Sequence, residues 1–170
     1  MSEPEVWLRG PLPDLAALLQ PVGHSLLQCR GEVRAVLPPL TAVQLWSRPG
    51  GAASVGFHTR HAVGSLDRLF TYARGEQLSP VQLGALANEA RVDEDERIAS
   101  ILVDEFDAAV ERAFVQLRAT PESSLLEPRE VGRGRLPSTV IGLLFHAAEH
   151  TQRHVGQLVT TAKVVLGGGR

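Results

Sequence analysis

Residues 139–166 read TVIGLLFHAAEHTQRHVGQLVTTAKVVL and contain three of the six histidines of the chain. The stretch holds no proline, and Gly167-Gly168-Gly169 follows it. Projected at about 100° per residue, it gathers apolar side chains on one face of a helix. These are Val140, Leu143, Ala147, Leu158, Ala162 and Val165. The pattern predicts one long amphipathic helix from about Thr139 to Leu166.

The first long helix is predicted to begin at Asp14, because aspartate accepts hydrogen bonds from the free N–H groups of a helix N-terminus. Residues 6–13 before it are typical of a short extended segment. Pro21 and Gly23 lie inside the helix, so we expect a kink or a split in its first third. Pro38-Pro39 marks its end.

Two further long helices have clear boundary residues. Ser54 is a suitable N-cap for the second long helix, and Gly75 ends it. The third begins at Ser79-Pro80, where a serine, a proline and a glutamine stand at the spacing of a capping box. We expect it to pause near residues 91–93 and to continue until Pro121.

The segment LTAVQLW predicts a short extra helix near residues 41–47, because its threonine and glutamine stand at the capping-box spacing. We expect the rest of the protein to leave its large apolar side chains partly uncovered. These are Leu40, Leu45 and Trp46. Uncovered apolar side chains favour self-association, so the segment predicts a homodimer.

Signals for β-strands are nearly absent, since no segment shows sustained alternation of β-branched and polar residues. Residues 121–138 are rich in proline, glycine and charge, which indicates a loop. The chain is therefore predicted to be all-α: an up-and-down four-helix bundle with a long third connection and a short extra helix near residues 41–47. Its 170 residues suit a single domain, 1–170.

Composition narrows the possible partners and location. A formal net charge of −2 argues against a strongly basic nucleic-acid binder. No apolar run is long enough to cross a bilayer, so no membrane partner is expected. The N-terminus lacks the pattern of a secretory signal, and Cys29 is the only cysteine. We therefore expect a cytoplasmic protein.

The histidines of the last helix cannot all bind one ion. A helix rises about 1.5 Å per residue, so His146 and His154 lie about 12 Å apart along its axis, whereas metal–ligand bonds measure about 2 Å. His154 lies inside the apolar face, His150 at its edge and His146 towards the polar side. Periodicity therefore favours His150 and His154 as a pair of metal ligands.

A metal site with an open position usually needs a third protein ligand. The second helix offers His58 and His61. The apolar face of that helix centres nearer His58, so periodicity favours His58 over His61. His24, in the first helix, is a more distant candidate.

The motifs GFHTRHAVGSLDRL (residues 56–69) and HTQRHVGQL (residues 150–158) together resemble the DinB/YfiT-like superfamily. The resemblance implies a four-helix bundle with a long crossover that holds a divalent metal, zinc or nickel. It implies one ligand from the second helix and a histidine pair from the last. The family pattern places the second-helix ligand directly before the small apolar stretch, which matches His61. The final pair matches His150 and His154.

The same resemblance implies a metal-dependent enzyme that acts on small molecules. Relatives of known chemistry use low-molecular-weight thiols, so the expected activity is that of a thiol-dependent S-transferase or a hydrolase, with a thiol as a possible cofactor. Members of the family often form dimers. Two alternatives stay open: a metal-binding module without turnover, and a helical bundle whose histidines only pack and whose surface serves dimerisation.

Four other features near these motifs have weaker functional interpretations. The arginines of residues 129–135 suit an anionic substrate, although a flexible basic loop explains them as well. Gln157 continues the histidine stripe and is expected to orient His154. Glu149 projects to the polar face as a solvated charge. Cys29 is interpreted as a small buried apolar residue rather than as an activated thiol.

Overall fold

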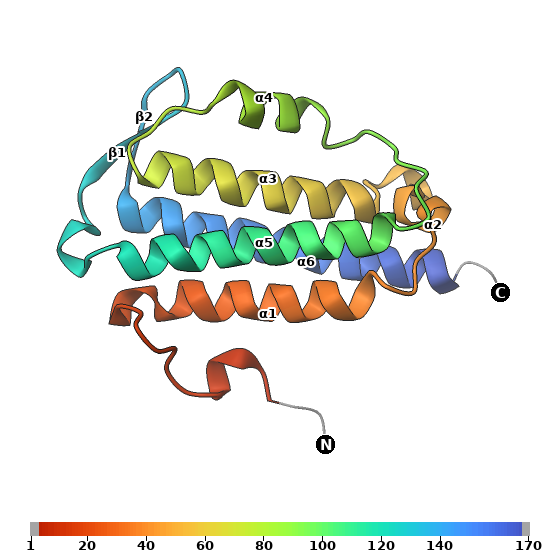
Figure 1. Ribbon diagram of the computed structural model, residues 1–170, viewed down its shortest axis with the longest axis horizontal. Coiled ribbons are helices and arrows are strands. Elements are labelled where there is room, and N and C mark those ends of the chain that lie inside the picture. Colours follow the sequence, from red (N-terminus) through yellow and green to blue (C-terminus); the bar gives the residue numbers. More distant parts are fainter. Residues whose placement is uncertain (1–3, 168–170) are drawn as a thin grey trace.

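The structure is a computed structural model, and it describes residues 4–167. Its four long helices pack side by side (Figure 1). They are α1 (Gln20–Val36), α3 (Val55–Ala73), α5 (Ile98–Ala119) and α6 (Val140–Gly167). The remaining elements are α2 (Ala42–Trp46), α4 (Pro80–Ala87), β1 (Pro128–Val131), β2 (Leu136–Thr139) and short 3-10 turns at Val6–Leu8, Ala17–Leu19, Pro49–Gly51 and Glu122–Ser124. The predicted four-helix bundle and its short extra helix are confirmed.

The directions of the helices differ from a simple up-and-down order. Gln116, near the end of α5, donates to the Phe70 carbonyl near the end of α3 at 2.9 Å, so α3 and α5 run the same way. In Figure 1 both run from right to left, whereas α1 and α6 run from left to right. The bundle is therefore ordered up, down, down, up. The predicted up-and-down order was wrong, because no local signal in the chain specifies the direction of α5.

Two parallel neighbours need a connection that returns along the bundle. Residues 74–97 make this return and carry α4 along the outside of α3 (Figure 1); we call them the crossover. The Gln82 amide donates to Asp67 and Thr71 at 2.7 Å, and Trp46 Nε1 donates to the Asp93 carbonyl at 2.8 Å. The third connection, residues 120–139, is long as predicted. The crossover is longer still, because the predicted third helix, expected to begin at Ser79 and only to pause near residues 91–93, is two separate helices, α4 and α5, that run in opposite directions (Figure 1).

Capping explains several of the helix boundaries. Thr41 and Ser79 each form a complete capping box, and the Ser54 hydroxyl accepts from Phe57 N at 3.2 Å. Gly75 follows α3 with a φ of 79°, a left-handed conformation that glycine adopts without strain. These predicted boundaries are confirmed, and α6 also begins and ends within a residue of its predicted limits. Gly168 and Gly169 lie outside the described residues.

The start of α1 was predicted wrongly. Asp14 has a φ of 58° and caps no helix, and α1 begins at Gln20 after a 3-10 turn. Pro21 occupies the first turn, where its missing N–H costs nothing, so it starts the helix instead of kinking it. Residues 6–8 form another 3-10 turn within the segment predicted to be extended.

A small antiparallel hairpin replaces part of the predicted loop 121–138. Strands β1 and β2 pair from Pro128 opposite Thr139 to Val131 opposite Leu136. The hairpin lies at the end of the bundle where α3 ends and α6 begins (Figure 1). The Arg129 guanidinium fastens it there by donating to the Ala73 carbonyl at 2.8 Å.

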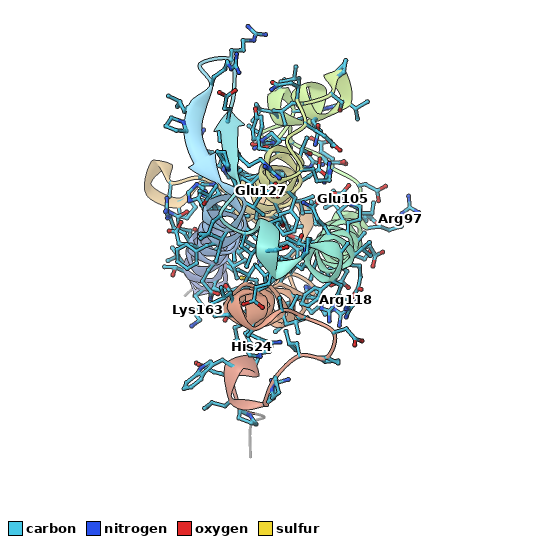
Figure 2. The ribbon with its side chains drawn as sticks, turned by 90° about the vertical axis from the view of Figure 1, so that its left-hand side faces the viewer. His24, Arg97, Glu105, Arg118, Glu127 and Lys163 are labelled. Carbon is cyan, nitrogen blue, oxygen red and sulfur yellow. The ribbon has the colours of Figure 1, made fainter. Side chains whose placement is uncertain are left out.

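The core lies between the four long helices. Its largest fully buried side chains include Leu26, Leu66, Leu102, Phe106, Leu117, Leu144 and Leu158. Charged side chains such as Arg97, Arg118 and Lys163 lie on the outside of the bundle (Figure 2). Among residues 4–167, the helices are too short or too polar to form a membrane span.

The structural basis proposed for a homodimer is not present. Leu40 and Leu45 are buried within the monomer, at 4% and 0% exposure, and Trp46 is half-buried. Val43 alone of the large apolar residues in α2 is exposed. Dimerisation thus stays a prediction that rests on the family resemblance.

Candidate metal centre

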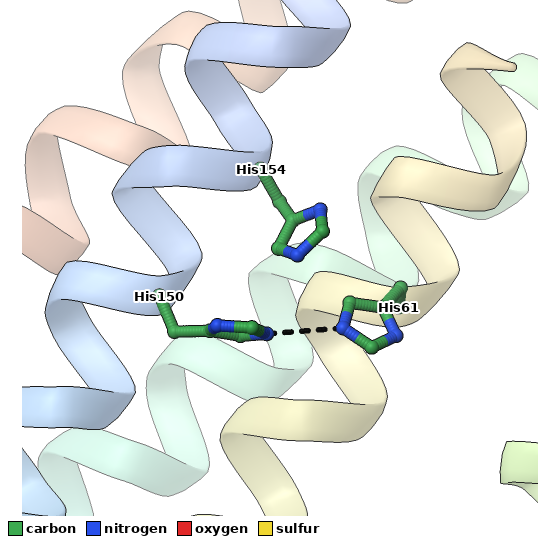
Figure 3. A group of neighbouring side chains, drawn as sticks. All are labelled: His61, His150 and His154. Atoms are coloured by element: carbon green, nitrogen blue, oxygen red, sulfur yellow. Dashed lines mark hydrogen bonds between the residues drawn. The ribbon is translucent and has the colours of Figure 1, made fainter. Parts of the chain in front are cut away.

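Helices α3 and α6 lie antiparallel and bring three of the predicted ligands together. His61 comes from α3, and His150 and His154 come from successive turns of α6. One ring nitrogen of each lies within 4.8 Å of the others. In Figure 3 each ring turns a nitrogen towards the space between the three side chains. All three side chains are half-buried, so the cluster lies at the edge of the core.

The spacing of these nitrogens fits one divalent ion. Zinc–nitrogen bonds of about 2.1 Å in tetrahedral geometry place two ligand atoms about 3.4 Å apart. His61 Nε2 and His150 Nε2 are 3.0 Å apart, and the widest pair is within 4.8 Å. The residues therefore fit a metal site with three histidine ligands.

Glu89 contacts His61 from the side facing away from His150. His61 Nδ1 donates to Glu89 Oε2 at 2.7 Å, and Arg68 Nη1 donates to Glu89 Oε1 at 2.8 Å. Burial of the carboxylate would raise the pKa of Glu89, but the hydrogen bonds from His61 and Arg68 outweigh it and lower the pKa below its usual value. Sequence analysis missed Glu89 because it lies in a turn after α4, where helix periodicity gives no signal.

His58 lies beside His154 and not inside the cluster. The Nδ1 atoms of the two rings are 2.9 Å apart, which leaves His154 Nε2 free for a ligand. His58 is only 6% exposed, so periodicity located the most buried histidine of α3, whereas the cluster contains its less buried neighbour. Gln157 was predicted to orient His154 but is exposed, and His58 makes that contact instead.

His146 does not belong to the three-histidine cluster, but its ring lies beside that of His150, with centroids 5.4 Å apart. Its side chain is exposed and lies 3.2 Å from Glu149, which also pairs with Arg153 on the polar face of α6. The Nδ1 atom of His150 is buried. Among the described residues, it is the one buried side-chain nitrogen or oxygen that has no hydrogen-bond partner.

The surroundings of His58, His150 and His154 favour the uncharged form of these three side chains. Burial, together with neighbouring histidines, lowers the pKa of His58 and of His150. The same causes, burial foremost, lower the pKa of His154 to about 4. A neutral imidazole is the form that binds a metal, so these shifts favour ligation by His150 and His154.

An aromatic side chain, Phe57, lies against the cluster. The Phe57 ring stacks on His61 with centroids 5.5 Å apart and planes 17° from parallel. Phe57 also lines a cavity of about 210 Å³ between α2, the start of α3 and the crossover. Its other lining residues are Trp46, Arg48, Ala53, Ser54, Ala90 and Val92.

The remaining candidates lie outside the centre. Arg129 and Arg135 belong to the hairpin at the bundle end, where they pair with Glu127 and Glu130. The Cys29 thiol is fully buried, which raises its pKa to about 12 and confirms that it is not activated. His24 Nε2 lies 3.0 Å from the Gly10 carbonyl, away from α3.

Comparison with known proteins shows one matching family model and a solved structure with the same fold. The family model described as the DinB superfamily matches residues 25–158, which include all three histidines. A crystal structure of a conserved protein from Enterococcus faecalis is similar, with a TM-score of 0.71 and 20% sequence identity. The similarity covers 88% of this chain and 97% of that one, and at this identity it shows a shared fold. No curated protein sequence matches the chain.

Proposed function

The chain belongs to the DinB superfamily, and from this premise we propose that it is a metal-dependent enzyme acting on small molecules. The family and the three-histidine cluster fit a metal-binding protein. The finer proposal is zinc or nickel on His61, His150 and His154, and the activity of a thiol-dependent S-transferase or a hydrolase. The observation that carries it is the convergence of three imidazole nitrogens within 4.8 Å at the edge of the core.

Three protein ligands would leave an open position, at which a divalent ion lowers the pKa of a bound water or thiol. The residues of the chain have three tasks in such a site. His150 and His154 present their nitrogens from one helix face, His61 supplies the third from α3, and the buried contacts of His58 and Glu89 hold the rings in place.

Two side chains of the protein, Cys29 and Glu149, are poorly suited as a nucleophile or a general base. Cys29 is buried with a raised pKa. The Glu149 carboxylate is exposed to solvent and pairs with Arg153 and His146, so it is poorly suited as a general base. This is compatible with a nucleophile that comes from solvent or from a small thiol, as the thiol-transferase and hydrolase types implied by the family resemblance would use.

Metal analysis with a thiol titration tests the proposal. Chelator-treated protein is reloaded with zinc or with nickel, and bound metal is measured by elemental analysis. We expect about one ion per chain. Adding a low-molecular-weight thiol to the nickel-loaded protein should then produce a near-ultraviolet sulfur-to-metal charge-transfer band.

The outcomes separate the alternatives. Absence of stoichiometric metal would refute both metal-based functions and leave a bundle whose histidines only pack. Bound metal that neither takes up a thiol nor catalyses ester hydrolysis would favour a non-catalytic metal-binding module. Homodimerisation and a cytoplasmic location are part of the proposal, and light scattering at micromolar concentration tests the former.

A further inference from the structure

Glu89 is a buried carboxylate that comes from outside the four helices of the bundle. It lies in the crossover just after α4, and it is only 6% exposed. Ionised side chains are rarely buried to this extent unless they are paired. Both of its oxygen atoms are paired, one with each of two side chains of α3.

These contacts determine which nitrogen of His61 carries the proton. A carboxylate only accepts hydrogen bonds, so His61 Nδ1 must donate to Glu89 Oε2. The Nε2 atom of a neutral ring is then left with its lone pair, and it faces His150 Nε2 at 3.0 Å. The ring is thus held both in the tautomer and in the orientation that a ligand needs.

A glycine makes room for this arrangement. A Cβ atom on Gly64 would lie 2.7 Å from Arg68 Nη1 and 2.7 Å from Glu89 Oε1, closer than such contacts allow. Arg68 is the second anchor of the carboxylate and is itself mostly buried. The carboxylate therefore has one fixed position, between Arg68 and His61.

We propose that Glu89 is a positioning residue for the metal centre: the crossover uses it to hold His61 as an Nε2 ligand. This rests on the proposed function, because it takes His61 to be a ligand. Glu89 itself acts through His61 and does not contact the ion. Carboxylates in this position orient the ring, and their loss typically lowers metal affinity about 10–100-fold.

Glu89→Gln tests the inference with a side chain of the same size. Arg68 can only donate, and hydrogen bonds to a charged group are the stronger ones, so the glutamine oxygen should face Arg68. The amide NH₂ would then face His61 and force Nδ1 to accept. His61 should change from the Nδ1–H to the Nε2–H tautomer, which places a proton on the ligand nitrogen.

Two readouts follow the change. Nitrogen-15 NMR of the metal-free protein reports the His61 tautomer, and competition with a chelator at fixed pH reports the dissociation constant for zinc. Gln82→Ala is the matched control, because Gln82 also ties the crossover to α3 but does not touch His61. Gly64→Ala is a second variant, which displaces the carboxylate and keeps its charge.

For Glu89→Gln we expect the tautomer change and zinc binding weakened about 10–100-fold. Gly64→Ala should weaken zinc binding too, whereas Gln82→Ala should change neither readout. The inference is overturned if Glu89→Gln keeps the Nδ1–H tautomer, or if Gln82→Ala weakens zinc as much, since Glu89 would then only tether the crossover. If the unaltered protein binds neither zinc nor nickel, the proposed function fails, and the tautomer alone decides whether Glu89 positions His61.

Discussion

Replacing His61 or His58 by alanine should have very different effects on metal binding. The two histidines lie one turn apart on α3, but only His61 has a nitrogen in the cluster. His58 contacts the cluster through the Nδ1 atom of His154, at 2.9 Å. We therefore expect His61→Ala to abolish stoichiometric binding and His58→Ala to weaken it.

The magnitudes follow from linkage between binding and folding. Metal at about 100 times its dissociation constant stabilises the native state by about 2.7 kcal/mol. For a domain of this size, that corresponds to a rise in Tm of about 5–11 °C. Loss of a contact to a ligand typically weakens binding about 10–100-fold. At the same metal concentration, His58→Ala should then retain about 0.4–1.4 kcal/mol of stabilisation, or about 1–6 °C.

Thermal unfolding of each variant, with and without zinc, measures these shifts, and elemental analysis gives the stoichiometry. We expect the zinc-induced rise in Tm to be largest in the unaltered protein, smaller in His58→Ala and almost absent in His61→Ala. A variant His61→Ala that keeps the full shift while His58→Ala loses it would refute the assignment. His58 would then be the ligand that helix periodicity favoured.

Three further predictions concern stability and reactivity. Without metal, the unfolding free energy should fall as pH drops from about 6.5 to about 4, because unfolded chains protonate His154 before the native state does; urea titrations at several pH values measure this. Gly56→Ala should lower stability by about 1–3 kcal/mol, because its Cβ would lie 2.7 Å from the Trp46 ring. A Cβ on Gly156 would lie in open space, so Gly156→Ala should raise the free energy of unfolding by up to about 1 kcal/mol. Equal effects of the Gly56 and Gly156 substitutions in urea titrations would contradict this reasoning. Cys29 should react with a thiol reagent no faster than the protein unfolds, which absorbance kinetics can follow.

Features that depend on neighbouring residues could be predicted from the sequence. The capping boxes at Thr41 and Ser79 form within four residues, so their residue types suffice to locate the helix starts. The pairing of His150 with His154 follows from the four-residue spacing together with the apolar face of the helix. Asp14 misled the prediction because a residue with capping chemistry also suits a left-handed turn.

Features that depend on distant segments could not be predicted. The apolar face of α3 predicts that His58 is buried, and it is. That face points to the centre of the core, whereas a metal site with an open position needs a ligand at the edge of the core, where His61 lies. The family resemblance, and not periodicity, pointed to His61. Glu89 reaches His61 across 28 residues, and the direction of α5 sets where the crossover runs. No local sequence pattern predicts the contact between Glu89 and His61 or the direction of α5.

The parallel course of α3 and α5 also bears on how fast the chain folds. In an up-and-down bundle, helices that are neighbours in the chain pack together, so most contacts are local. Here the contact between α3 and α6 joins residues that are 89 and 96 positions apart. Contacts of such long range raise the contact order, which slows folding. We therefore expect refolding in stopped-flow experiments to be slower than for an up-and-down bundle of equal length and stability. His150 and His154 both lie on α6, so they can bind a metal ion as soon as this helix forms. His61 can join them only after α3 has packed against α6.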